Sequence, residues 1–138
     1  TIRKHQLSPD IVMKYNDSQK MNRDQIFDLY QKKDLFSIGV ILFSTFFGSE
    51  LWDPTQEHTP MKKYNDIIRL HQVINRRLND STEDQVTKLI LRLILKLIPY
   101  NIFDIISLKE FVFSVSEIEE LNNSSTRLEQ PNKRMRLI

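Results

Sequence analysis

Apolar residues recur along this chain at the three- to four-residue spacing of helices, except in one stretch that is apolar throughout. Residues 35–48 carry no charge. A helix that is apolar on every side is stable in water only when other elements bury it all round, and this run is shorter than the roughly 20 residues that span a bilayer. The pattern predicts a buried central helix from Asp34 to Phe47. Gly48 is expected to end it, and Gly39 to make room for a close neighbour.

Shorter periodic segments precede this run. Asp34 is placed as the first residue of the central helix, where a carboxylate suits the exposed backbone N–H groups. Upstream, the pattern predicts a short helix over residues 11–15, a polar loop over 16–23 and a second short helix over 24–31.

Three helices are predicted after the apolar run. Residues 61–78 place apolar side chains and His71 on one face. A second helix runs to about residue 98, with Ser81 among its N-cap candidates and Pro99 at its end. Ser107 begins a capping box that starts the last helix.

The last segment, residues 121–138, is polar and is predicted to be a disordered basic tail. Within it Lys133, Arg134 and Arg136 fit the spacing of a nuclear import signal, although short basic termini are also common as solvating tails. A cytoplasmic or nuclear location is therefore expected.

Composition supports a helical class and excludes several kinds of site. With 2 Gly, 5 Pro and no Cys in 138 residues, the chain is expected to be all-α, without disulfides or thiolate metal sites. Its net charge of +2, with signs mixed along the chain, does not favour a nucleic-acid groove. No membrane span or signal peptide is visible. Three scattered histidines predict no metal site, and His71 is expected to be a packed core residue.

Two motifs resemble the protein kinase family. The run Asp34-Leu35-Phe36-Ser37-Ile38-Gly39-Val40-Ile41-Leu42-Phe43 is similar to the family's Asp-x-Trp/Phe-Ser-x-Gly signature, and Gly48 with Leu51-Trp52 resembles the exit from that helix. Ser8-Pro9-Asp10 resembles the Ala-Pro-Glu that closes the activation segment. The resemblance implies the distal half of a kinase C-terminal lobe over residues 1–120, with 16–31 as an insertion.

That resemblance implies a function for a longer parent. The parent would transfer phosphate from ATP to Ser or Thr of protein substrates, while this segment supplies the structural core and part of the substrate-binding surface. Asp34 would hold the catalytic loop, with Ser37 and Gly39 completing the helix motif. The activation-segment end would place Thr1, Gln6 and Leu7 near the substrate.

The phosphate-binding and catalytic motifs of kinases are missing from this sequence. A Gly-rich loop, a His-Arg-Asp and an Asp-Phe-Gly are all absent. No catalytic, cofactor-binding or metal-binding residue is therefore expected in this chain, and ATP and Mg²⁺ are expected to bind the N-terminal remainder of the parent. A protein substrate or protein partner is the expected ligand.

One departure from the family's sequence pattern favours a different function. Where kinases have an Arg that pairs with the Glu of Ala-Pro-Glu, this chain has Ile102, and Asp10 stands in place of that Glu. Asp10 is therefore expected to be exposed, to cap its local helix, or to pair with another cation such as Arg92. The alternative function is a pseudokinase or an all-helical interaction scaffold without catalysis.

Overall fold

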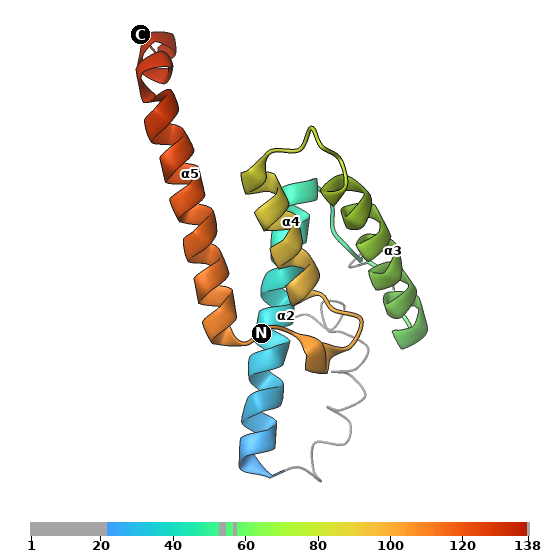
Figure 1. The fold of residues 1–138 in the computed structure, drawn as a ribbon. Coiled ribbons are helices and arrows are strands. Elements are labelled where there is room, and N and C mark those ends of the chain that lie inside the picture. Colours follow the sequence, from blue (N-terminus) through green and yellow to red (C-terminus); the bar gives the residue numbers. More distant parts are fainter. Residues whose placement is uncertain (1–21, 53–54, 57, 138) are drawn as a thin grey trace.

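Four α-helices and one short 3-10 helix make up the part of the chain that the structure describes (Figure 1). This computed structural model describes residues 22–52, 55–56 and 58–137, with side chains as far as residue 124. Those residues contain no strand, so the all-α class is confirmed for them. In chain order the elements are α2 (Arg23–Phe47), α3 (Pro60–Leu78), α4 (Gln85–Leu97), η3 (Ile102–Asp104) and α5 (Leu108–Leu137).

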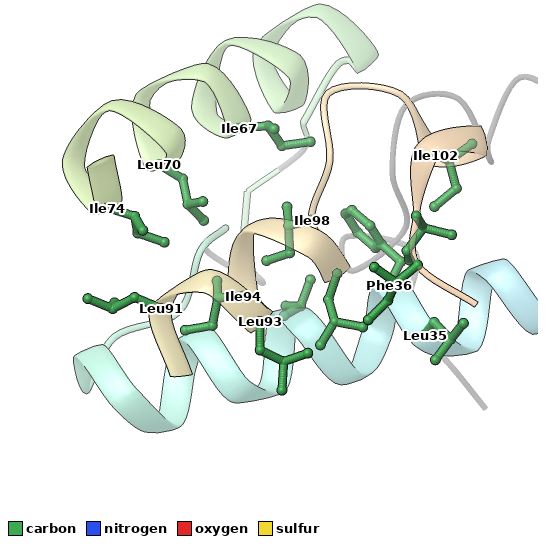
Figure 2. Packing of buried hydrophobic residues seen from close by; sticks show 14 of the residues in the cluster. Leu35, Phe36, Ile67, Leu70, Ile74, Leu91, Leu93, Ile94, Ile98 and Ile102 are labelled. Atoms are coloured by element: carbon green, nitrogen blue, oxygen red, sulfur yellow. The ribbon is translucent and has the colours of Figure 1, made fainter. Parts of the chain in front are cut away.

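The helix at the centre of this arrangement is α4, and not the charge-free run that the sequence pattern favoured. It contacts α2, α3 and α5, and Figure 2 shows it lying between α3 and α2. Its side chains Leu91, Ile94 and Leu97 are completely buried. Because it faces a neighbour on three sides, its fully exposed residues are polar, namely Gln85, Arg92 and Lys96.

The charge-free run lies in the second half of α2, and the predicted burial on every side is wrong. Leu35, Phe36 and Val40 are buried in the core, but Ile41 is 56% exposed and Ile38 is 38% exposed. A stretch without charge tolerates burial on every side, but it does not need a neighbouring helix on every side. Among the described residues, α2 packs mainly against α4.

The start of α2 also differs from the expectation. The helix begins at Arg23, where Asn22 and Gln25 form a capping box: the Gln25 N–H donates to Asn22 Oδ1 at 2.8 Å and the Asn22 N–H donates to Gln25 Oε1 at 3.1 Å. The predicted short helix over 24–31 and the predicted central helix are therefore one continuous helix. Asp34 lies in its middle and does not cap it.

Most other predicted boundaries are close to those observed. Gly48 ends α2 in the left-handed conformation, at φ 73°. The Ser107 hydroxyl accepts from the Glu110 N–H at 3.1 Å, as expected at the start of α5. The N-cap of α4, however, is Asp84 and not Ser81, and it accepts from the Thr87 N–H at 2.7 Å.

The last helix is longer than predicted. Its first turns pack partly buried side chains against the core, namely Phe111, Val115 and Ile118. It then continues as a helix to Leu137 (Figure 1), through the residues for which a disordered tail was predicted. This segment is polar, with more Asn, Ser and Arg than apolar residues. A helix satisfies most of its own backbone hydrogen bonds, so it can continue through such a segment without burying a core face.

Candidate functional site

The residues of the kinase-like motif lie within two turns of α2 but have different environments. Ser37 is buried, and its hydroxyl donates to the Lys33 carbonyl oxygen at 3.0 Å, one turn back along the helix. Gly39 is buried, and Asp34 is exposed. Ser37 and Gly39 are thus parts of the packed interior, and only Asp34 offers a polar group to another molecule or segment.

Gly39 is where α2 and α4 approach most tightly. A Cβ atom added at Gly39 would lie 2.7 Å from Leu97 Cβ and 2.9 Å from Ile98 Cγ1. Such distances are well inside van der Waals contact. The prediction that this glycine admits a close neighbour is confirmed, and the neighbour is the C-terminal end of α4.

Asp34 lies on an uncovered face of α2, with Ile38 one turn and Ile41 two turns further along the same face. A carboxylate on such a face can accept hydrogen bonds from backbone N–H groups or pair with a cation of whatever covers the face. Because α2 begins at Arg23, the helix-cap role expected for Asp34 is wrong.

A buried lysine lies close to the motif and was missed by the sequence analysis. Lys63 of α3 is only 4% exposed, and its Nζ lies 5.0 Å from the centre of the Trp52 ring. The Trp52 ring in turn stacks on Phe36, with 6.0 Å between ring centres. Cation–π attraction stabilises an ammonium group in this position. This cluster joins α2, α3 and the end of the motif.

The spacing of apolar residues along α3 could have predicted that Lys63 is buried. The buried stripe of α3 passes through Ile67, Leu70 and Ile74. Lys63 is four residues before Ile67 and so belongs to the same stripe. A lysine on an apolar stripe is usually read as its boundary, because its aliphatic stem packs while its charge reaches water.

His71 is a core residue, as predicted. It is buried on α3, and its Nε2 lies 2.6 Å from the carbonyl oxygen of Ile98, at the end of α4. A carbonyl oxygen only accepts, so Nε2 carries the proton. The ring stacks on Tyr100, with 4.1 Å between centres. Burial lowers the pKa of His71, and the hydrogen bond to Ile98 opposes that shift only in part.

The lowered pKa of His71 predicts loss of stability in weak acid. The folded state binds the His71 proton less readily than the unfolded state does, so the full contribution is present above about pH 6.5 and declines as the pH falls below that value. His71→Gln keeps an N–H donor but does not titrate. We expect urea unfolding midpoints to fall less between pH 7.5 and pH 5 for this variant than for the wild type. Equal slopes in both proteins would contradict the prediction.

Several predicted site residues lie outside the described part of the chain. These are Ser8, Pro9 and Asp10, which the resemblance places at the end of an activation segment, and Thr1, Gln6 and Leu7, which it places near a substrate. The side chains of the basic tail, Lys133, Arg134 and Arg136, also lie beyond those described. Arg92 is exposed on α4. The pairing expected for Asp10 therefore stays a prediction.

No group of three or more His, Asp or Glu side chains within the described ranges could hold a metal ion. None of the helices described combines the length and the apolar character needed to cross a bilayer.

Comparison with protein-family models, with curated proteins and with solved structures finds no match for this chain. Functional assignment therefore depends on the residues and on their arrangement.

Proposed function

We propose that this chain forms the distal, helical part of a protein kinase-like C-terminal lobe, whose parent transfers phosphate from ATP to Ser or Thr of protein substrates. The observation that carries this function is the succession of elements after the motif. A helix bearing Asp-x-Phe-Ser-x-Gly ends at Gly48 and is followed by α3, α4 and α5. The family resemblance leads one to expect three further helices after this signature.

The close approach at Gly39 also supports this function. It supplies a physical reason for a glycine within the signature, because a side chain there would overlap Leu97 of α4. The exposed face of α2 is a second support. Asp34, Ile38 and Ile41 form the kind of surface that a preceding half of the lobe would cover, with the Asp34 carboxylate available to backbone donors of a catalytic loop.

A scaffold without catalysis is the second candidate, and one observation favours it. Ile102, which stands where the family has an ion-pairing Arg, is 1% exposed and belongs to the hydrophobic core. An apolar side chain that fills this position removes the need for a buried ion pair and can be as stable as the pair. A lobe that does not keep this ion pair is consistent with a pseudokinase or an interaction module.

Substitution of Asp34 in the phosphotransferring parent tests the two candidates. Asp34→Asn keeps the shape of the side chain and removes its charge. If Asp34 holds the catalytic loop, we expect phosphotransfer to fall about 100-fold, since small displacements of catalytic groups have effects of this size. The melting temperature should change little, because the side chain is exposed.

Asp28→Asn is the matched control, since Asp28 is another carboxylate exposed on α2 and pairs with Lys32 of the same helix, at 3.0 Å. Equal activities of the two folded variants would remove the catalytic-loop role of Asp34. A wild-type parent that transfers no phosphate at all would favour the scaffold.

A further inference from the structure

Four exposed side chains form a line along the first half of α2. They are Arg23, Phe27, Tyr30 and Asp34. Phe27 is 70% exposed and Tyr30 is 44% exposed, which is unusual for two aromatic residues on one helix face. Steps of four, three and four residues place all four side chains on one stripe of the helix.

The chemistry along this stripe is complementary to itself. In chain order it is basic, aromatic, aromatic and acidic. When two such helices lie antiparallel, Arg23 of one copy meets Asp34 of the other, and Phe27 meets Tyr30. Each of these contacts then occurs twice, as two-fold symmetry requires. Each Asp34 also lies near the positive N-terminal end of the opposite helix, which favours a carboxylate.

We infer that two copies of this chain associate through the stripe Arg23–Phe27–Tyr30–Asp34, with their α2 helices antiparallel. Two aromatic pairs lie at the middle of the contact, where they exclude water, and an ion pair closes each end. The stripe is short, about 17 Å at 1.5 Å per residue. The dimer is therefore weak and forms at high protein concentration.

A second antiparallel register is possible on the same helix but is disfavoured by charge. It pairs Phe27 with Ile41 and Tyr30 with Ile38, and so covers more apolar surface. It also places the two Asp34 carboxylates opposite each other, and like charges facing one another at an interface oppose association. The two registers predict opposite effects of Asp34→Asn: weaker association in the first and stronger association in the second.

The dimer does not depend on the proposed kinase function, although both use Asp34. Asp34 cannot hold a catalytic loop and pair with Arg23 of a second copy at the same time. The association is measured on the 138-residue chain without ATP or substrate, so its outcome and the outcome of the phosphotransfer experiment are independent.

Sedimentation equilibrium up to about 1 mM protein tests the inference. We expect the wild type to dimerise as concentration rises. Arg23→Asp and Asp34→Arg should each weaken the dimer about tenfold or more, because each brings like charges together. An equimolar mixture of these two variants should associate again, since opposite charges then face each other at both ends of a mixed pair.

Ile41→Asp is the control variant, because Ile41 is 56% exposed on α2 but lies beyond the inferred contact. It should dimerise like the wild type, and circular dichroism should show equal helix content in all variants. A wild type that stays monomeric throughout the concentration range overturns the inference. So does a failure of the mixed variants to associate, or a dimer that Ile41→Asp abolishes.

Discussion

Gly39→Val is expected to lower the free energy of unfolding by about 3 kcal/mol. The first added carbon would already lie 2.7 Å from Leu97 Cβ and 3.3 Å from the Leu97 carbonyl carbon, and backbone atoms of α4 cannot rotate away. The helices must therefore separate, which loosens contacts along the whole α2–α4 interface. Urea unfolding followed by circular dichroism measures the loss.

Ile41→Val is the matched control for this substitution, since it introduces the same side chain on the exposed face of the same helix. We expect it to change stability by less than about 0.5 kcal/mol. If the two variants were equally stable, α2 and α4 would not pack at Gly39 as the structure has them.

Ile94→Ala is the second substitution with a large expected effect, a loss of about 2–5 kcal/mol. Ile94 is completely buried in α4, which lies between α2 and α3 (Figure 2). Removing its outer carbons leaves a cavity inside the hydrophobic core, which the packed neighbours can only partly close. Thermal unfolding and urea unfolding should agree on the loss.

Ile41→Ala provides the comparison, because it removes the same atoms from the helix that the sequence pattern placed at the centre. We expect its cost to stay below about 1 kcal/mol, mostly the loss of partial burial. A larger loss for Ile41→Ala than for Ile94→Ala would mean that α2, and not α4, is the centre of the fold.

Helix positions and ends were predictable where a local rule decides them. Gly48 ends α2 because a residue without Cβ adopts the left-handed conformation most easily. Thr59 and Pro60 start α3 through a side-chain cap and a proline in the first turn, one residue before the predicted start at residue 61. Each of these signals acts over a few neighbouring residues, and the sequence displays those neighbours directly.

The start of α2 was missed although its signal is also local. Asn22 and Gln25 have the spacing of a capping box. Asn22 was placed in a loop over residues 16–23, and residues 24–31 were predicted to form a separate short helix, with Asp34 as the first residue of the apolar run. A carboxylate stabilises a helix start, but an exposed Asp inside a helix costs no more than about 0.7 kcal/mol, so its presence does not fix where the helix begins.

Among the residues of the candidate site, too, some were predicted from the sequence and others were missed. His71 was recognised as a core residue because a histidine on an apolar helical face is usually packed. Lys63 lies on the buried stripe of α3, but it was not recognised as buried, since a lysine there usually extends its ammonium group to water and this one lies over the Trp52 ring from outside α3. No spacing along α3 shows which aromatic rings will lie beside its ammonium group.

The sequence by itself determined the helical class, the approximate extents of α3 and α4, the end of α2 and the need for space at Gly39. All of these follow from periodicity, capping and the size of single side chains, which are properties of neighbouring residues. Only the tertiary structure decided that α4 is the central helix and that Ile38 and Ile41 face solvent. An apolar pattern indicates which faces of a helix can be buried. Which of those faces are buried depends on how many other helices pack against that helix.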